Sequence, residues 1–257
     1  QKGVAMVKLV LFASSVMVII IITLCICKRK IKQQEVKDKI LKITALLSVF
    51  FHYSSLWIDF LKYGTASVDN TMLFPIYPCN ICMWLLLIVA FMKNKNTFIY
   101  KTIVEFLSIV GTICGLIGLF ANEIFISNPN FFDYNALKGL LSHSVMIFGT
   151  TFLLTQGYVK LRTLSVTLST ILGLSLFVCD GIIINSLFKV FNLPEVNAMY
   201  LLHFPIEKPF INSITLGIIG IIVLFLIMTV YELLFLNREE RWYHNINKKQ
   251  AMNEKKE

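Results

Sequence analysis

The sequence predicts an all-α, polytopic integral membrane protein that crosses the bilayer seven times. Hydrophobic residues make up 56% of the 257 residues, and the mean hydropathy is +0.72. Charged residues contribute 15%, whereas soluble globular domains contain about a quarter. Because each bilayer-spanning helix needs about 20 apolar residues, these helices use nearly the whole chain. We therefore expect one helical membrane domain over residues 1–236 and a short basic tail over residues 237–257.

Seven apolar stretches, separated by short polar loops, mark the predicted spans in chain order. The third stretch begins irregularly, because Pro75 and Pro78 both fall near its start. No internal repeat is convincing, which argues against a transporter built from inverted repeats. The predicted spans are Leu9–Cys27, Ile40–Leu61, Leu73–Met92, Phe98–Phe120, Leu140–Leu154, Thr163–Phe188 and Ile211–Leu236.

The basic residues are distributed unevenly between the two sides of this predicted bundle. Of the 24 Lys and Arg residues, 18 fall on one side, in residues 28–42, 93–101, 160–162 and 238–256, and the other 6 fall on the opposite side. Since Lys and Arg accumulate in cytoplasmic loops, we expect the N-terminus outside the cell and the C-terminus in the cytoplasm. The net charge of +9 then reflects topology and attraction to anionic lipid headgroups, and we expect no nucleic-acid partner.

Ionisable side chains inside membrane spans cost roughly a few kcal/mol or more each, so they usually mark function. In the predicted topology they gather in the outer half of the bundle. His52 and Asp59 are seven residues apart on one helix face. Cys79 and His143 lie at the outer starts of the third and fifth spans, and Asp180 lies in the outer part of the sixth. We expect a polar cavity that opens toward the outer leaflet. For His52 helix packing is the favoured alternative, and interfacial solvation explains Asp59 equally well.

Cys79 and Cys82 form a Cys-x-x-Cys pair, which is typical of redox dithiols. A membrane thiol oxidoreductase needs a second pair to pass electrons on, and the other four of the six cysteines do not supply one. A metal site built from Cys79, Cys82 and His143 would lack a fourth clear ligand. We therefore expect neither a redox centre nor a bound metal, and no cofactor motif is visible.

Cys79 and His143 together suggest chemistry on lipids rather than transport. A thiolate is a nucleophile, and an imidazole is the usual base that generates it. Cys79 follows Pro78 at the start of a helix, where the positive end of the helix dipole favours the thiolate. Backbone amides after Cys79 are candidate oxyanion donors. The thiolate would attack a phospholipid ester, and the resulting thioester would pass its acyl chain to a lysophospholipid hydroxyl activated by His143.

Three short segments, taken in order, carry a resemblance to a known family. They are Leu-Phe-Pro-Ile-Tyr-Pro-Cys-Asn-Ile at 73–81, Leu-Ser-His-Ser at 141–144, and Asn-Ala-Met-Tyr-Leu at 197–201, which is followed by Pro205, Lys208 and Pro209. Glu105-Phe106 in the fourth span fits the same pattern. Over roughly residues 40–236 the chain resembles the transmembrane protein 164 acyltransferase family, which includes bacterial seven-span members.

The resemblance implies an enzyme of the plasma membrane, here of a bacterium, that moves acyl chains between glycerophospholipids. Membrane phospholipid and lysophospholipid would then be its partners. By the same resemblance Cys79 becomes the nucleophile and His143 its partner. The residues expected to bind or orient the substrate are Asn197, Asp180, Tyr200, His52 and Asp59.

Two other function classes stay open. The first is a small-solute transporter, or the binding component of one, which would use the outer polar cavity as its site. Such a protein should need Asp59 and Asp180 more than Cys79. The second is a catalytically inactive relative with a structural or partner role. An enzyme should instead be labelled at Cys79 by a thiol-reactive probe, and lipid should protect it.

Overall fold

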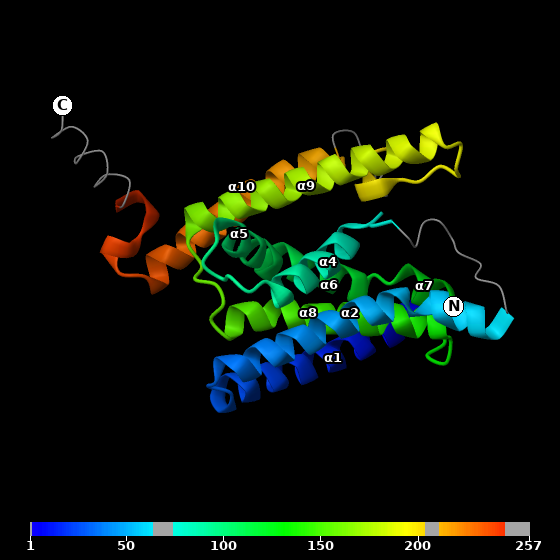
Figure 1. Cartoon of the computed structure of the whole chain (residues 1–257), viewed down its shortest axis with the longest axis horizontal. Helices are drawn as coiled ribbons and strands as arrows, with labels where there is room; N and C mark the ends of the chain where they lie inside the picture. The colour runs from blue at the N-terminus through cyan, green and yellow to red at the C-terminus, as the bar shows by residue number, and fades with distance from the viewer. Residues whose placement is uncertain (1, 64–73, 204–210, 245–257) are drawn as a thin grey trace.

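The computed structural model describes residues 2–63, 74–203 and 211–244, and these residues form an all-α fold (Figure 1). Within this part the side chains of residues 2, 55, 59, 62 and 63 are also outside the description. The elements in chain order are α1 (Lys2–Lys30), α2 (Gln34–Tyr63), α4 (Pro78–Phe91), α5 (Phe98–Phe106), η1 (Leu107–Gly111), α6 (Thr112–Phe120), α7 (Glu123–Ser127), α8 (Tyr134–Thr155), α9 (Thr163–Val190), η2 (Ala198–Tyr200), α10 (Ser213–Phe235) and η3 (Arg238–Glu240).

Each of the seven predicted apolar segments falls largely on a helix. In the described part of the chain, five helical segments are long and apolar enough to cross a membrane: Gly3–Lys30, Phe98–Ser127, Tyr134–Thr155, Thr163–Val190 and Ser213–Phe235. The structure therefore supports a multi-pass membrane protein with five candidate spans. The count of seven, with α2 and the short α4 added, and the orientation of the termini stay predictions.

Four predicted helix starts differ from the structure by five residues or more. The first two helices begin earlier than the predicted spans, α1 at Lys2 rather than Leu9 and α2 at Gln34 rather than Ile40. The third predicted span begins at Leu73, which lies outside the described residues, whereas α4 begins at Pro78, the first helical position, where proline costs least. The fifth predicted span begins at Leu140, whereas α8 begins earlier, at Tyr134. There the carboxylate of Asp133 accepts a hydrogen bond from the backbone N–H of Asn135 and caps the helix.

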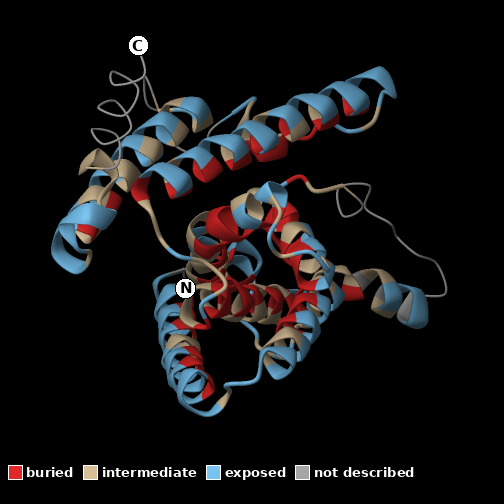
Figure 2. Cartoon of the chain, turned by 60° about the vertical axis from the view of Figure 1, so that its left-hand side comes forward, coloured by how far each residue is buried: buried red, intermediate tan, exposed pale blue. Residues whose placement is uncertain are grey.

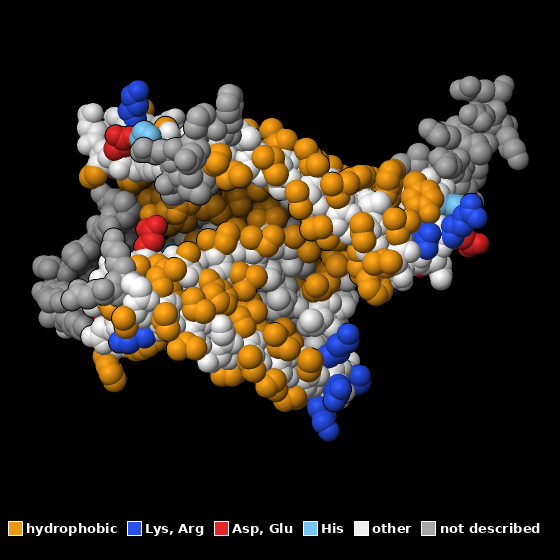
Figure 3. All heavy atoms as spheres, turned by 180° about the vertical axis from the view of Figure 1, so that it is seen from behind, with side chains coloured by type: hydrophobic (Ala, Val, Ile, Leu, Met, Phe, Trp, Pro, Cys, Tyr) orange, Lys and Arg blue, Asp and Glu red, His pale blue; other side chains and the backbone are white. Residues whose placement is uncertain are grey.

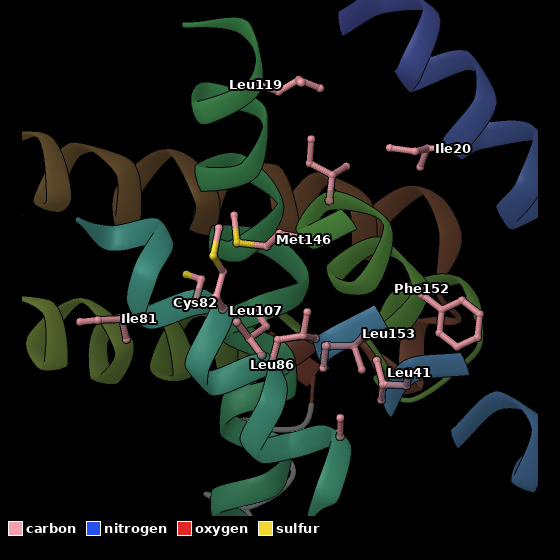
Figure 4. Packing of buried hydrophobic residues seen from close by; sticks show 14 of the residues in the cluster. Ile20, Leu41, Ile81, Cys82, Leu86, Leu107, Leu119, Met146, Phe152 and Leu153 are labelled. Atoms are coloured by element: carbon pink, nitrogen blue, oxygen red, sulfur yellow. The ribbon is translucent and has the colours of Figure 1, made fainter. Parts of the chain in front are cut away.

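Helices α1, α2 and α4 to α8 pack into a bundle with a continuous apolar core. Figure 4 shows Leu86 of α4, Leu107 of η1 and Met146 of α8 among the buried side chains that fill its centre. These three residues are at most 1% exposed. Figure 2 shows buried residues concentrated inside this bundle, whereas on α9 they follow the face turned toward it.

The rod from Phe98 to Phe120 is interrupted by one π-helical turn, η1, between α5 and α6. Beyond this turn, α6 lies unusually close to α8. A Cβ atom on Gly115 would lie 2.6 Å from Cγ1 of Ile147, and one on Gly111 would lie 2.9 Å from Cγ2 of Thr150. Small residues at such contacts allow the backbones of membrane helices to approach. The π-helical turn thus sets which side chains of α6 face α8.

Helices α9 and α10 form a hairpin along one flank of the bundle (Figure 1). Its attachment to α5 depends on Glu105, which is 8% exposed. The Glu105 carboxylate accepts hydrogen bonds from Ser165 Oγ at 2.7 Å and from Ser169 Oγ at 2.5 Å. One turn after Ser169, Gly173 of α9 lies against the ring of Phe106 of α5, and an added Cβ on Gly173 would lie 2.1 Å from that ring. The hairpin is therefore held by one buried carboxylate and one close aromatic contact.

A second buried carboxylate, Glu232 of α10, closes the same end of the hairpin. Glu232 is 1% exposed, and it accepts hydrogen bonds from the backbone N–H of Thr163 at 2.6 Å and of Trp242 at 2.7 Å. The Trp242 ring packs on Phe225, with 5.4 Å between centroids. The start of the predicted basic tail thus folds back on α10, and residues 245–257 lie outside the described part of the chain.

Asp38 joins three chain segments near the N-terminal end of α2. Its carboxylate accepts hydrogen bonds from Lys95, from Tyr158 Oη at 2.6 Å and from Gln34 Nε2 at 2.8 Å. Asp38 precedes the apolar part of α2, and Lys95 and Tyr158 lie in the loops after α4 and α8. Burial opposes ionisation, but these hydrogen bonds outweigh it and hold the pKa of Asp38 below its usual value.

Replacing Glu105 with leucine removes the acceptor of two serine hydroxyls between α5 and α9. We expect the free energy of unfolding in detergent to fall by roughly 1–3 kcal/mol, because buried hydroxyls lose their partner. Glu105→Gln, which keeps one carbonyl acceptor, should lose less. The exposed Glu239→Leu is the matched control, and equal melting temperatures for Glu105→Leu and this control would contradict the assignment.

Because the pKa of Asp38 is lowered by folding, its contribution is present above the unfolded value of about 3.9 and is lost as the pH falls through the folded value. Asp38→Asn should therefore be less stable than the unaltered protein at pH 7, and the difference should shrink as the pH approaches 3. Melting curves in detergent across this range measure it. The exposed Glu35→Gln is the control, and an Asp38→Asn deficit that does not change with pH would refute the linkage.

Candidate active site

Cys79 lies in the first turn of α4. Tyr77 is extended at the helix boundary, with φ −108° and ψ 150°, and Pro78 occupies the first turn. The Cys79 thiol is half-buried and donates to Oδ1 of Asn80 at 3.4 Å. The backbone N–H groups of Cys79 and Asn80 interact with this sulfur, and the N–H of Asn80 also donates to the Tyr77 carbonyl at 2.9 Å. Cys82, one turn further, is 0% exposed in the apolar core (Figure 4).

His143 lies on α8, and its ring is held in one orientation. Nδ1 is 2.7 Å from the backbone carbonyl oxygen of Gly139. Because that oxygen only accepts, Nδ1 carries the proton of the neutral ring and Nε2 carries the lone pair. Nε2 is buried and has no hydrogen-bond partner among the described residues. The ring lies against Gly118 of α6, where an added Cβ would be 2.1 Å from Nε2. His143 is therefore prepared as a hydrogen-bond acceptor.

The same helix, α6, connects Cys79 and His143. Cys114, one turn before Gly118, interacts electrostatically with Cys79, while Gly118 contacts the His143 ring. Two positions four residues apart are about 6 Å apart along a helix axis. This turn of α6 therefore contacts the His143 ring at one end and lies within electrostatic range of Cys79 at the other. Among the described residues no hydrogen bond joins Sγ of Cys79 to Nε2 of His143.

His52 of α2 extends this polar region between α2 and α8. It interacts electrostatically with Lys138 and His143. On the same helix pair, Tyr134 Oη donates to Ser54 Oγ at 2.6 Å. His52 therefore belongs to a buried polar contact between two helices and lies near the proposed base. Asp59 also belongs to α2, but its side chain lies outside the described part of the chain.

Asn197 holds the shape of the segment between α9 and α10. Its Oδ1 accepts from the backbone N–H groups of Leu202 at 3.0 Å and His203 at 3.2 Å, and its Nδ2 donates to the His203 carbonyl at 2.5 Å. We expected Asn197 to orient a substrate or the histidine. In the structure its amide is instead hydrogen-bonded to the backbone of its own loop. Pro205, Lys208 and Pro209 of the same motif lie outside the described residues.

This loop is joined to the segment before Cys79. The backbone N–H of Met199 donates to the carbonyl of Ile76 at 2.8 Å, and the rings of Tyr77 and Tyr200 lie 5.6 Å apart between centroids. Met199 and Tyr200 adopt left-handed backbone conformations, with φ of 55° and 54°, which non-glycine residues rarely do. The first and third resembling segments, far apart in sequence, therefore meet in the fold.

Asp180 lies on α9 and is half-buried. Its Oδ2 atom is buried and has no hydrogen-bond partner among the described residues. Its neighbour Gly181 faces the η2 loop, where an added Cβ would lie 2.6 Å from Cδ1 of Leu201. Asp180 thus lies near the loop that carries Asn197 and Tyr200. Among the described residues it makes no hydrogen bond to Cys79 or His143.

Two acidic residues at this end of the molecule were missed by the sequence reasoning. Glu123 begins α7, next to Asn122, whose amide lies against Gly139 below His143. Glu123 also interacts electrostatically with Tyr200. Glu195 lines a cavity together with Tyr77 and Tyr200. Asn122, which caps α7, is the sequence signal that could have placed Glu123 at a helix start. Glu195 carries no such signal, because in sequence it looks like any other charged residue in a loop.

The cavity at this loop has a volume of about 290 Å³. It is lined by Ile76, Tyr77, Glu195, Val196, Asn197 and Tyr200. Beside it, Figure 3 shows a hollow with hydrophobic walls between the α9–α10 hairpin and the bundle. A pocket with both polar and apolar walls thus borders an apolar hollow, which suits an amphipathic ligand. Within the described residues no group of three or more His, Cys, Asp or Glu could hold a metal ion.

Comparison with known proteins gives one match. A family model described as the TMEM164 family matches residues 4–238, which is most of the chain and includes α1. No curated protein and no solved structure matches the chain.

The contact between Gly118 and His143 predicts a specific double-variant result. Gly118→Ala alone should lower the free energy of unfolding by roughly 1–3 kcal/mol, because its Cβ would occupy the space of the His143 ring. In a His143→Ala background the same change should cost nothing or stabilise the helix, since alanine favours helices over glycine by about 1 kcal/mol. Unfolding in detergent measures both.

Gly220→Ala on α10 is the control, because nothing lies within 4 Å of a Cβ at that position. If Gly118→Ala costs the same with and without His143, the two residues are not in contact as described.

Proposed function

This chain belongs to the TMEM164 family, which is linked to lipid acyltransferase activity, and we propose that it is a membrane-embedded transacylase acting on glycerophospholipids. The observation that carries this proposal is the meeting of the Tyr-Pro-Cys segment with the Asn-x-x-Tyr-Leu loop, through the Met199–Ile76 hydrogen bond and the Tyr77–Tyr200 contact. Two of the segments that carry the family resemblance, although far apart in sequence, are thus brought together at one site, as an active site requires.

In the proposed reaction Cys79 is the nucleophile and His143 moves the proton. His143 Nε2 takes the thiol proton, and the sulfur attacks the ester carbonyl of a donor phospholipid. The C–S bond forms, the ester C–O bond breaks, and the departing lysophospholipid oxygen receives the proton from His143. An acceptor lysophospholipid hydroxyl then attacks the thioester, gives its proton to His143, and the proton returns to the cysteine sulfur. No redox partner is needed.

Three features of the fold support these roles. The unpartnered Nε2 of His143 is the lone pair that a general base needs. The backbone N–H groups of Cys79 and Asn80 interact with the Cys79 sulfur, where the positive end of the helix dipole favours a thiolate. His143 and Cys79 are not hydrogen-bonded in the structure, and catalytic hydrogen bonds often tighten only when substrate is bound. The His143 ring contacts α6 at Gly118, and Cys79 lies within electrostatic range of Cys114, one turn earlier on the same helix.

The proposed substrate enters from the bilayer. The hollow in Figure 3 has hydrophobic walls that suit an acyl chain, and the described faces of α9 and α10 expose many large apolar side chains to lipid. We further propose seven spans, with the N-terminus outside and the C-terminus in the cytoplasm. Most of the Lys and Arg side chains visible in Figure 3 lie at one end of the molecule, as the positive-inside rule requires. Cys79 would then face the outer leaflet.

The alternative function is a small-solute transporter or binding component. The polar cavity of about 290 Å³ beside Asn197 is the observation that favours it. In that case loss of the acids Asp180 and Asp59 should abolish activity, and loss of the Cys79 thiol should be tolerated.

Cys79→Ala should lower acyl transfer at least about a hundredfold, because the proposed thioester forms on the Cys79 sulfur. The measurement is movement of a labelled acyl chain from phospholipid to lysophospholipid in liposomes that contain the full-length protein. Cys82→Ala is the matched control: its thiol is fully buried in the apolar core, so transfer should persist at near the original rate. Full transfer by Cys79→Ala would show that the nucleophile is assigned wrongly.

A second readout follows the intermediate itself. Without an acceptor, donor lipid should leave an acyl label on Cys79 that hydroxylamine removes, and the same lipid should protect Cys79 from iodoacetamide. An acyl label that persists in Cys79→Ala would place the intermediate elsewhere.

A further inference from the structure

Asn80, the residue after Cys79, is a polar side chain at a position where the packing of α4 favours an apolar one. It is 3% exposed, and the next three residues, Ile81, Cys82 and Met83, are buried in the apolar core. Asparagine is a poor helix former, and an amide buried among apolar side chains is unfavourable unless it is hydrogen-bonded. Stability alone therefore does not explain an asparagine at this position.

The Asn80 side chain is directed at the sulfur of Cys79. Among the described residues it makes one hydrogen bond, in which Sγ of Cys79 donates to Oδ1 at 3.4 Å. A primary amide also carries two N–H donors, so the Nδ2 atom of Asn80 is left for another group. The oxygen and nitrogen ends of an amide exchange places when it turns by about 180°. The same side chain is therefore able to accept from a thiol and to donate to a thiolate.

The titratable groups that interact with the Cys79 sulfur carry no positive charge. They are Cys82 of the same helix, Cys114 of α6 and Tyr200 of η2. The proposed base, His143 of α8, makes no hydrogen bond to the sulfur among the described residues. Apolar surroundings oppose a negative charge on sulfur. A thiolate at Cys79 therefore depends on the helix dipole and on the hydrogen-bond donors that reach it.

We propose that Asn80 is a positioning residue that stabilises the Cys79 thiolate by turning its amide and donating from Nδ2 to the sulfur. In the thiol form the S–H group donates to Oδ1. Once the proton has left, the turned amide donates to an anionic sulfur, and such charge-assisted hydrogen bonds are roughly twice as strong as neutral ones. Asn80 therefore shifts the balance from thiol toward thiolate. Its part in acyl transfer rests on the proposed function, whereas its effect on the thiol does not.

Alkylation by iodoacetamide measures the thiolate without any lipid substrate. The thiol proton goes to the buffer, the sulfur forms a C–S bond with the methylene carbon of the reagent, and the C–I bond breaks to release iodide. Because the thiolate is the reacting form, the rate at a fixed pH follows its population. The full-length protein is used in detergent. Every sample carries Cys82→Ala, so that mass spectrometry assigns the label on this segment to Cys79.

Asn80→Asp and Asn80→Leu separate the two ends of the amide. Both keep a side chain of similar size, but an aspartate retains only oxygen acceptors and a leucine retains neither acceptor nor donor. We expect each variant to slow the alkylation of Cys79 at pH 7 about tenfold. The midpoint of the rate against pH should rise by about one unit, because a tenfold loss of thiolate corresponds to one pH unit. Asn94→Ala, in the exposed loop after α4, is the control and should leave the rate unchanged.

Two outcomes would overturn this role of Asn80. Equal alkylation rates for Asn80→Asp, Asn80→Leu and the unaltered protein would show that the amide does not act on the thiolate. Faster alkylation of a folded Asn80→Leu would show that Asn80 only holds the thiol. If either variant fails to fold, the smaller pair Asn80→Ser and Asn80→Ala repeats the comparison. The serine hydroxyl is a donor, so Asn80→Ser should react faster than Asn80→Ala, and equal rates for this pair would contradict the proposal.

Acyl transfer by the same proteins separates this inference from the proposed function. Asn80→Leu should lower kcat about tenfold and leave KM nearly unchanged, because lipid binding does not need the thiolate. Slower alkylation of the variants, in a protein whose unaltered form transfers no acyl chain, would uphold the role of Asn80 at the sulfur and refute the enzyme. Acyl transfer by the unaltered protein, with alkylation unaffected by Asn80→Asp and Asn80→Leu, would uphold the enzyme and refute the role of Asn80.

Discussion

The bonds from Ser165 and Ser169 to the buried carboxylate of Glu105 determine how the two parts of this molecule are joined. Inside an apolar bundle no water is available to satisfy a carboxylate, so the protein must supply its donors. Those donors come from α9, and they fix one end of the α9–α10 hairpin against α5. The other end of α9 is held by a different device, the loop through η2 that hydrogen-bonds to Ile76. Between the two attachments Phe177 of α9 packs on Phe106 of α5, and the hollow of Figure 3 lies between the hairpin and the bundle.

The candidate site is the place where this second attachment is made. The loop brings Tyr200 onto Tyr77, and Tyr77 leads directly into the helix whose first turn holds Cys79. From the other side α6 brings its glycine face onto α8, which leaves just enough room for the His143 ring. The proposed base is thus positioned by the packing of α6 on α8, and the proposed nucleophile by the start of α4.

The apolar pattern was sufficient to predict the helices, because long hydrophobic runs have few alternatives in a membrane. The family resemblance is also confirmed, and the match extends it to α1. The sequence was less informative where tertiary contacts decide. The start of α8 was missed because the Asp133 cap lies before the apolar run. The role of Asn197 depends on the backbone path of its own loop. The left-handed conformation of Tyr200 could not be predicted, because glycine is the usual sequence signal for it and none is present there. Glu195 becomes notable only after the fold places it beside two tyrosine rings.

The π-helical turn Leu107–Gly111 has a consequence for the direction in which the side chains of α6 point. Such a turn is equivalent to one extra residue inserted in a continuous α-helix, and it is frequent at functional sites. Each residue of an α-helix turns the chain by about 100°, so the insertion sets the rotation of all of α6 relative to α5. Without it, Gly118 would no longer face His143, and a bulkier neighbour would press on the ring. One codon therefore separates an α6 that accommodates the imidazole from one that excludes it.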